Sequence, residues 1–533
     1  MRKTRFLIVA LAALLVLCAF TACNTESDSK DDSNESSSDT STTPEEESSS
    51  TPILPEVDPE IYQYLEFYSN GDGTCSITSI GNYEAEHLVI PAFSPDGDRV
   101  TSVGSSDGKC ILNYKKVTIP DGVETIRTAF RNCDALEVIY IPKTVKAIEG
   151  SFQDSVNIKE VHITDMSAWM NIVFNSDFGN PLYHSDAVLY LKGKPVIDLV
   201  IPDNVTSIGD YAFAGYEHLR SITATADSNL THIGERAFYS CQKLMRAVLS
   251  AKLSTIEEEA FNNCRRLVEV VNPSDLDIVR GNSNGYIGYS AIKVETDPAA
   301  ESRLIFSDDF VFYNDEDNGR ILLIACFAET EEIVLPSDFN GEGYYINSFC
   351  FIPEVTDRLV IGAGVKGIRD YGLANFSLKE ITFESGSQLR HIGSFSFSYC
   401  GIESIHLPAE TIVIGAGAFE NCKNLSSVTF EENSKLKLIG STAFGNCSKL
   451  SEITIPESVM CIGQQAFVGY RINGVAFEDP KGWSRGSSFD AIPEQSLSSS
   501  RTAATIIRMG DMLFKGTQEE YMEFIALDEL KFN

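Results

Sequence analysis

Apolar residues recur along most of the chain in one fixed order, with a step of 22 to 25 residues wherever repeats are adjacent. The stretch 439–467, IGSTAFGNCSKLSEITIPESVMCIGQQAF, begins and ends with the same pattern, Ile-Gly followed closely by Ala-Phe. Between the two copies lie a Cys, a Leu, two Ile residues that alternate with polar residues, and a Pro. The Phe of this pattern recurs at Phe130, Phe152, Phe213, Phe238, Phe261, Phe397, Phe419, Phe444 and Phe467. A fixed order at such a period is typical of a repeat architecture.

Each repeat contains two short extended segments. Apolar and polar residues alternate over 450–455, which predicts a strand with one buried face that ends at Pro456. Residues 459–463 predict a second short strand, and the Ala-Phe pair with its polar neighbours predicts a turn or short helix. Such a coil can bury its Leu, Ile, Val and Phe only against other coils, so many coils must stack. We therefore predict a leucine-rich repeat solenoid, mainly β, of about 14 coils in two blocks, with a parallel concave sheet.

The repeat resembles that of the BspA-like leucine-rich repeat family of bacterial surface proteins. The shared pattern, F-x-x-C-x-x-L-x-x-I-x-I-P-x-x-V-x-x-I-G, covers roughly residues 85–480. Residues 475–483, VAFEDPKGW, are similar to the closing segment common in that family. The resemblance implies a role in adhesion to host matrix proteins or to other bacteria. The periodicity by itself predicts only the solenoid.

Interruptions of the repeat suggest how the chain is divided. We expect an N-terminal cap at 53–84, a first repeat block at 85–272 with an irregular insertion at 164–195, an irregular insertion with a hairpin at 273–331, a second block at 332–480, and a C-terminal cap with a helix at 481–533. The hairpin is predicted by two apolar runs around the polar turn Asn314–Gly319. Thr517 and Glu520 have the spacing of a capping box, so a helix should begin there. That helix either closes the end of the solenoid or belongs to a loosely attached tail.

The first 52 residues have the pattern of an export signal and a tether. Residues 1–22 combine a basic start with an apolar run that is too short to be a comfortable membrane span. The small residues before Cys23 resemble a bacterial lipobox, so we expect a lipoprotein signal peptide, lipidation of Cys23 and anchoring at the outer membrane, facing outward. An ordinary secretory signal cut near Ala22 is the alternative. Residues 23–52 are nearly all Ser, Thr, Asp, Glu, Asn and Pro, which predicts a disordered acidic tether.

The net charge of the chain indicates which class of binding partner to exclude. The 533 residues carry a formal net charge of −34. A strongly acidic surface repels phosphate backbones, so we expect no nucleic acid partner.

Cysteine usage predicts packing rather than chemistry. Six of the 13 cysteines share one repeat position, three residues after the Phe: Cys133, Cys241, Cys264, Cys400, Cys422 and Cys447. Tyr216 stands at that position in another coil, so the position requires bulk rather than sulfur. One or two disulfides among Cys75, Cys110, Cys326, Cys350 and Cys461 remain open, and the sequence does not pair them.

No motif points to catalysis. The chain lacks C-x-x-C and H-E-x-x-H patterns, so we expect no metal, no cofactor and no enzymatic activity. The GAGVKG match at 362–367 has no surrounding βαβ unit, and we assign it to the turn between two strands.

The surface that the repeat itself predicts is the concave sheet. Residues that flank the middle Ile of each strand should point outward, because side chains alternate along a strand. We propose as binding residues on this face Thr118, Tyr140, His162, Thr223, Arg246, Thr382, His406, Thr429 and Thr454. Thr is also simply a good exposed strand residue, so the stripe by itself does not require a ligand.

Two functions remain open. The first is an adhesin that binds an extracellular protein on the concave face. The second is a glycan-capture or cell-envelope scaffold protein that uses the insertions, with Trp169 and Trp483 stacking on sugars.

Overall fold

The computed structural model describes residues 56–530, apart from 81–82, 84, 105–113, 184, 351–354, 375–377, 470–471 and 528–529. The predicted signal peptide 1–22, lipidation site Cys23 and tether 23–52 lie outside the described residues. Residues Thr51–Asn533 form one compact unit, which contains the hydrophobic clusters of the described residues. This unit is therefore expected to fold without the first 50 residues.

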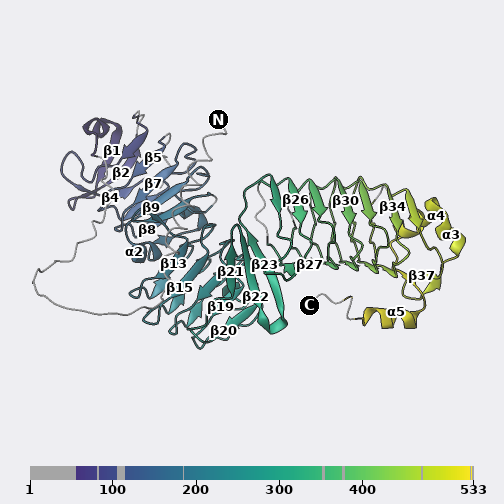
Figure 1. Cartoon of the computed structure of the whole chain (residues 1–533). Coiled ribbons are helices and arrows are strands. Elements are labelled where there is room, and N and C mark those ends of the chain that lie inside the picture. Colours follow the sequence, from purple (N-terminus) through teal and green to yellow (C-terminus); the bar gives the residue numbers. More distant parts are fainter. Residues whose placement is uncertain are drawn as a thin grey trace, which may run out of the picture. The chain divides into compact units, whose positions relative to one another are not determined.

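The chain forms a solenoid with two strands in most coils, as the repeat predicted (Figure 1). In the coil that opens with β34 (Glu452–Ile455), the second strand is β35 (Cys461–Ile462), and turns lead on to Phe467. We call the first strand of each coil the leading strand and the second the trailing strand. The described residues make about 17 turns rather than the predicted 14.

The first array comprises the coils before residue 296. Its leading strands are β3 (His87–Val89), β5 (Lys116–Thr118), β7 (Val138–Ile141), β9 (Glu160–Ile163), β11 (Val188–Leu191), β13 (Asp198–Ile201), β15 (Ser221–Ala224), β17 (Arg246–Val248), β19 (Glu269–Val271) and β20 (Lys293–Glu295). Its trailing strands are β4 (Arg99–Val103), β6 (Thr125–Arg127), β8 (Ala147–Glu149), β10 (Val173–Phe174), β14 (Ser207–Ile208), β16 (His232–Ile233) and β18 (Thr255–Ile256). At the N-terminal end, η1 (Pro59–Tyr64) and β1 (Leu65–Ser69) precede β2 (Thr74–Ile80), which pairs with β4.

Segment 164–195, predicted to be an irregular insertion, is a coil of the solenoid. Strand β10 pairs in parallel with β8, and β11 pairs in parallel with β9. The repeat was not recognised because helix α2 (Met166–Met170), η2 (Asp177–Gly179) and the short return strand β12 (Lys194–Pro195) replace its usual turns.

Segment 273–331 begins with one further coil, containing η3 (Asn284–Tyr286) and β20, and then forms an antiparallel sheet. Strands β22 (Phe310–Asp315) and β23 (Arg320–Cys326) are the predicted hairpin around η4 (Glu316–Asn318), and β21 (Leu304–Ser307) pairs with β22. Strand β23 then pairs in parallel with β25, so the hairpin starts the trailing sheet of the next coils.

The second array follows the hairpin. Its leading strands are β24 (Glu332–Val334), β26 (Arg358–Ile361), β28 (Glu380–Phe383), β30 (Ser404–Leu407), β32 (Ser427–Phe430), β34 and β36 (Gly474–Phe477). Its trailing strands are β25 (Tyr344–Ile346), β27 (Val365–Ile368), β29 (His391–Ile392), β31 (Val413–Ile414), β33 (Leu438–Ile439) and β35. The GAGVKG segment, residues 362–367, forms the turn between β26 and β27 and then the first part of β27, so it belongs to the turn between two strands, as predicted.

The repeated Phe residues form ladders through the core. Phe213, Phe238 and Phe261 stack with ring centroids 5.3 and 5.1 Å apart. In the second array the four rings from Phe397 to Phe467 are 5.1 to 5.3 Å apart. These spacings follow from the strand spacing of about 4.8 Å, because each coil places the same residue one strand further along.

The repeated cysteines are buried thiols, as the sequence predicted. Cys264 and Cys422 each point to the carbonyl of the Phe in the preceding coil, with an Sγ–O distance of 3.0 Å. Cys75, Cys326, Cys350 and Cys461 are likewise buried and unpaired by disulfides. Cys110 lies outside the described residues.

The C-terminal segment closes the second array. Strand β39 (Leu513–Lys515) pairs antiparallel with β35 and with β37 (Trp483–Arg485), which in turn pairs with β38 (Asp490–Ala491). Helices α3 (Glu494–Ser498) and α4 (Ser500–Arg508) pack on β36. Helix α5 (Gln518–Ile525) starts at the predicted capping box of Thr517 and Glu520, and its Phe524 packs with Phe514 of β39. The helix is therefore part of the closing structure.

Candidate functional site

The leading strands place equivalent side chains in columns one strand apart. We call the outward-pointing residues of these strands the outer face; it corresponds to the predicted concave sheet. In β5, β7, β9 and β11, the register aligns Thr118, Tyr140, His162 and Tyr190 in one column. Because parallel strands are about 4.8 Å apart, aromatic rings in such a column are at stacking distance.

Three of these rings form a continuous stack, which we call the Tyr-His ladder. The centroids of Tyr140 and His162 are 4.5 Å apart with an interplanar angle of 16°. Those of His162 and Tyr190 are 4.7 Å apart at 12°. All three side chains are half-buried. The sequence therefore placed Tyr140 and His162 correctly on one face, and the structure adds Tyr190.

Charged side chains flank the ladder. The His162 Nε2 lies 2.8 Å from a carboxylate oxygen of Glu160, in the neighbouring column. The ammonium of Lys116 lies 6.0 Å from the centre of the Tyr140 ring. Burial, and then the negative charge of Glu160, raise the pKa of both Tyr140 and Tyr190, so both phenols stay protonated at neutral pH. Neither hydroxyl is hydrogen-bonded to any other described residue, so both can donate to a ligand.

Thr118 is not an exposed contact residue, which corrects the prediction. Its side chain is 2% exposed. The His87 Nε2 lies 2.8 Å from the Thr118 hydroxyl, and the His87 ring is 6.5 Å from the Tyr140 ring. A small Thr between larger neighbours leaves a gap, and His87 covers it from the preceding strand.

Further along the first array, the outer face is occupied by ion pairs. Arg246 on β17 lies 2.6 Å from a carboxylate oxygen of buried Glu269 and also donates to the carbonyl of Ala300. Its side chain is 17% exposed. The predicted contact residue Arg246 is thus engaged within the protein. Thr223 on β15 is half-buried.

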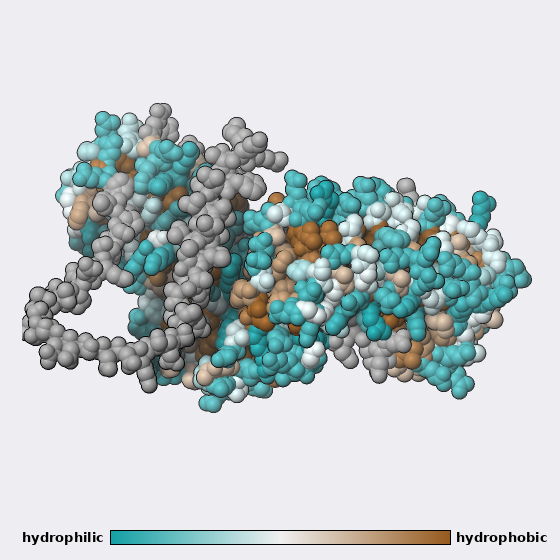
Figure 2. Space-filling model, viewed as in Figure 1, coloured by the Kyte–Doolittle hydropathy of each residue, from teal (hydrophilic) through white to brown (hydrophobic). Residues whose placement is uncertain are grey.

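The outer face of the second array is exposed. Thr382, His406, Thr429 and Thr454 occupy the predicted column on β28, β30, β32 and β34, and all four are exposed. The only link within this set among the described residues is between the His406 Nδ1 and the Thr429 hydroxyl, 2.8 Å apart. The side of the second array seen in Figure 2 is mainly hydrophilic, with small hydrophobic patches.

Both tryptophans are core residues, which corrects the prediction that they stack on sugars. Trp169 is 1% exposed, and its indole N–H donates to the carbonyl of Ala212 at 3.0 Å. Trp483 is 2% exposed, and its N–H donates to the carbonyl of Asp479 at 3.0 Å. Their aromatic faces are therefore not available to a ligand.

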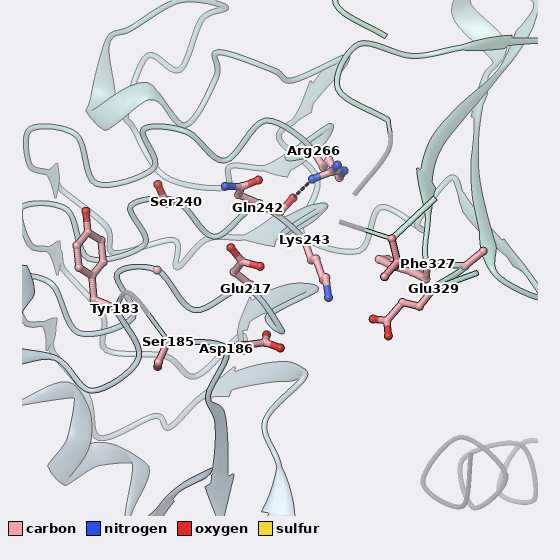
Figure 3. Close-up of a pocket in the computed structure, with 13 residues that line it drawn as sticks. Tyr183, Ser185, Asp186, Glu217, Ser240, Gln242, Lys243, Arg266, Phe327 and Glu329 are labelled. Atoms are coloured by element: carbon pink, nitrogen blue, oxygen red, sulfur yellow. Dashed lines mark hydrogen bonds between the residues drawn. The ribbon is translucent and has the colours of Figure 1, made fainter. Parts of the chain in front are cut away.

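A cavity of about 630 Å³ lies beside the turns of the first array (Figure 3). Carboxylates of Asp186, Glu217 and Glu329 share its wall with Lys243 and Arg266. A hydrogen bond from His218 lowers the pKa of Asp186, and burial lowers that of Arg266 to about 10. In the described part of the chain, no group of three His, Cys, Asp or Glu residues is arranged to hold a metal ion.

Tyr190 and His87 were missed by the sequence reasoning. Tyr190 lies in segment 164–195, where the repeat was not recognised. Its local sequence, Val188–Leu191 followed by a Lys-Gly turn, alternates like the other leading strands and could have revealed it. His87 precedes the middle Leu of the first leading strand, whose repeat lacks the diagnostic Phe and Cys. None of the helices in the described ranges is long and apolar enough to cross a bilayer.

Comparison with solved structures finds bacterial leucine-rich repeat proteins. Pneumococcal vaccine antigen PcpA is 23% identical over 37% of this chain with a TM-score of 0.32, and the match spans 58% of PcpA. A leucine-rich repeat protein from Bacteroides ovatus is 20% identical over 74% of this chain and 94% of its own length, with a TM-score of 0.29. A leucine-rich cell surface protein from Faecalibacterium prausnitzii is 22% identical over 78% of this chain and 86% of its own length, with a TM-score of 0.26. No curated protein sequence matches.

The family comparison covers most of the repeats. The model of the BspA type leucine-rich repeat region matches residues 75–177, 190–293, 344–473 and 433–525, in six copies. The first two ranges contain all three residues of the Tyr-His ladder, Tyr140, His162 and Tyr190. The last two ranges contain nearly all of the second array. Repeat pattern, stacked parallel coils and family match agree, and this chain belongs to the BspA-type leucine-rich repeat family.

Proposed function

We propose that this protein is a non-enzymatic binding protein of the bacterial cell surface, an adhesin that engages an extracellular protein through the outer face of the first array. The observation that carries the proposal is the Tyr-His ladder of Tyr140, His162 and Tyr190. Tyr side chains are enriched in protein interfaces because each combines a large apolar ring with a hydrogen-bonding hydroxyl.

The geometry of the ladder favours a polypeptide over a sugar. Rings that stack 4.5 and 4.7 Å apart cover one another's faces and leave mainly edges and hydroxyls for a ligand. A sugar would need an open ring face, whereas an extended polypeptide can bond to hydroxyls and pack against ring edges. Half-burial also fixes the rings before binding, which lowers the entropy lost on association.

Anchoring at the surface rests on the N-terminal sequence. Lipidation of Cys23 and the acidic tether 23–52 would hold the repeat unit at a distance from the outer membrane. Two or three acyl chains bind a membrane firmly, since each buried methylene contributes about 0.8 kcal/mol. Mass spectrometry of the intact protein tests the lipidation of Cys23, and a secreted product without a lipid would contradict it.

The binding test uses residues 51–533 on an array of matrix proteins and bacterial surface preparations. The triple variant Tyr140→Thr, His162→Thr and Tyr190→Thr removes the ladder but keeps a strand-forming residue that other coils have in this column. We expect at least about a tenfold loss of affinity for the protein ligand, because aromatic contacts dominate most interfaces.

A matched control changes the same column of the second array. The variant Thr382→Ala, Thr429→Ala and Thr454→Ala should bind as the unchanged protein does. Equal loss in both variants, or binding that survives removal of the ladder, would contradict the assignment to the first array.

A further inference from the structure

A cavity separate from the outer face lies where segment 273–331 meets the first coils of the second array. This cavity has a volume of about 740 Å³. Its lining includes four arginines: Arg265, Arg280, Arg320 and Arg369. The chain has 42 Lys and Arg residues against 76 Asp and Glu. Four arginines around one cavity are therefore unexpected in a protein with so many more acidic than basic residues.

The positive charge of this arginine cavity is only partly compensated. Arg320 lies 2.8 Å from a carboxylate oxygen of buried Asp315, which also accepts hydrogen bonds from Asn318. Arg369 donates to the neutral amide oxygen of Asn347 at 3.0 Å. Across the described residues, neither Arg265, Arg280 nor Arg369 forms an ion pair with a carboxylate.

The arginines are close enough to affect one another. Burial lowers the pKa of Arg369, and the positive charges of Arg320 and Arg280 lower it further. The carboxylates of Asp370 and Asp315 act in the opposite direction, but Asp370 already accepts from the backbone N–H of Ser394 and Asp315 is paired with Arg320. Like charges that repel across a partly buried cavity are stabilised when an anion binds between them.

The rest of the lining suits a sugar. Asn318, Asn347, Ser348 and Ser394 supply amides and hydroxyls that can bond to sugar hydroxyls. Tyr289 is 57% exposed at this cavity, so its ring can pack against a pyranose.

The wall formed by the second array is held in place by stacking. Tyr371 lies between Phe349 and Phe395, with centroid distances of 5.4 and 5.2 Å. The guanidinium of Arg265 lies 4.4 Å from the centre of the Phe349 ring. Stacking on an aromatic ring leaves the edge of a guanidinium free to bond to a carboxylate or sulfate with two parallel hydrogen bonds.

We propose that this cavity binds a short acidic oligosaccharide, whose carboxylate or sulfate group is held by Arg280 and Arg369 and whose sugar rings contact Tyr289. The volume fits a ligand of a few sugar units. The net charge of −34 opposes the approach of long polyanions, so a terminal acidic sugar is favoured over a polymer with many charges. This site is independent of the Tyr-His ladder.

The test titrates residues 51–533 with three ligands that share a lactose core: sialyllactose, which carries a carboxylate, lactose sulfate, and neutral lactose. Calorimetry should detect one or both acidic ligands, with binding that weakens as salt is added. Which of the two binds more tightly identifies the anionic group. Equal binding of neutral lactose, or no binding of either acidic ligand, would overturn the proposal.

Variants locate the site. Arg280 is exposed, so Arg280→Gln should leave the thermal unfolding unchanged while weakening acidic ligands about tenfold, the effect of losing one charged hydrogen bond. Arg501→Gln, an exposed arginine on α4, is the matched control and should have no effect. The ladder variant should also bind these sugars normally. An equal loss of affinity in Arg501→Gln would mean that the ligands bind by general charge attraction, and it would contradict a site at Arg280.

Two further probes test the ligand class. Inorganic sulfate that binds as tightly as lactose sulfate would leave no role for the sugar and would overturn the assignment. A glutamate-rich peptide that binds more tightly than either acidic sugar would do the same, and would make the cavity a site for acidic polypeptide.

Discussion

The outer faces of the two arrays differ, although both are built from the same repeat. In the first array, Thr118 is 2% exposed, Tyr140, His162 and Tyr190 stack, and Arg246 is paired with a buried carboxylate. In the second array, Thr382, His406, Thr429 and Thr454 are all exposed. The repeat thus specifies the inward residues of every coil, while the outward residues vary from one array to the other.

The difference arises from the size of adjacent residues in a column. Where neighbouring coils carry Tyr, His or Arg, side chains one strand apart reach one another and bury part of their surface. Where they carry mainly Thr, most side chains are too short to meet, and even His406 and Thr429, which contact each other, stay exposed to solvent. The first array therefore has a rigid outer face, and the second has a hydroxyl-rich, solvated one.

The largest predicted effect tests whether the interiors are equivalent despite this difference. Phe238→Ala in the first array and Phe419→Ala in the second each remove a fully buried ring from the middle of a ladder. Each should lower the free energy of unfolding by about 3–5 kcal/mol, through lost burial and the cavity that remains. Urea unfolding measures both. A cost that differs by more than a factor of two would mean that the interiors are not equivalent.

The next prediction compares two arginines at the same repeat position. Arg246 pairs with a Glu269 side chain that is 7% exposed, whereas Arg358 pairs with Glu332, and these two side chains are 54% and 43% exposed. Arg246→Ala leaves the buried Glu269 carboxylate without its ion-pair partner, with only the Ser302 hydroxyl and the Arg303 backbone N–H among the described residues still donating to it, and should cost about 3 kcal/mol. Arg358→Ala should cost at most about 1 kcal/mol, as for other exposed pairs. Similar costs would show that the first outer face is more hydrated than described.

A smaller effect is expected at the threonines. Thr118→Ala removes a buried hydroxyl that bonds to His87, and should cost about 1 kcal/mol. Thr454→Ala changes an exposed residue at the matching position and should stay within about 0.5 kcal/mol of the unchanged protein. Thermal unfolding of the two variants side by side provides the measurement, and a larger cost at Thr454 would reverse the comparison.

The smallest effect concerns pH. Burial lowers the pKa of His87 below its ordinary value of 6.5, and the charge of Lys116 lowers it further. The unfolded chain therefore binds this proton more readily, so the contribution to stability is complete above pH 6.5 and is lost as the pH falls from there through the folded-state pKa.

The variant His87→Gln should reduce the decrease in stability between neutral and mildly acidic pH, measured by urea unfolding. His406→Gln in the second array, where the imidazole is exposed, is the control. An unchanged pH dependence in His87→Gln would contradict the partly buried position of this ring.

The sequence was most informative about inward-facing residues. The buried Phe and Cys columns, the alternation at 450–455, the hairpin at Asn314–Gly319 and the capping box at Thr517 all depend on local pattern, and the structure contains each of them. Segment 164–195 was missed because α2 replaces the usual turn, so no Phe-x-x-Cys follows at the expected distance.

The outward-facing residues were harder to predict because their environment depends on the neighbouring coils. Thr118 was expected to be exposed, but it is buried, next to His87 of the preceding coil and Tyr140 of the following one. The two Trp residues were assigned to ligands by residue type alone, whereas their indole N–H groups bond to backbone carbonyls inside the protein. The arginine cavity joins residues from Arg265 to Arg369, a distance along the chain that no repeat pattern relates.

The reversed direction of β39 bears on whether copies of this protein can join end to end. A solenoid that ended on a parallel strand would offer a second copy an edge that matches its own first strand, and copies could join into fibres. An antiparallel β39, with α4 covering β36, makes the end unlike the beginning. Copies of the repeat unit are therefore expected to stay separate from end to end even at high concentration.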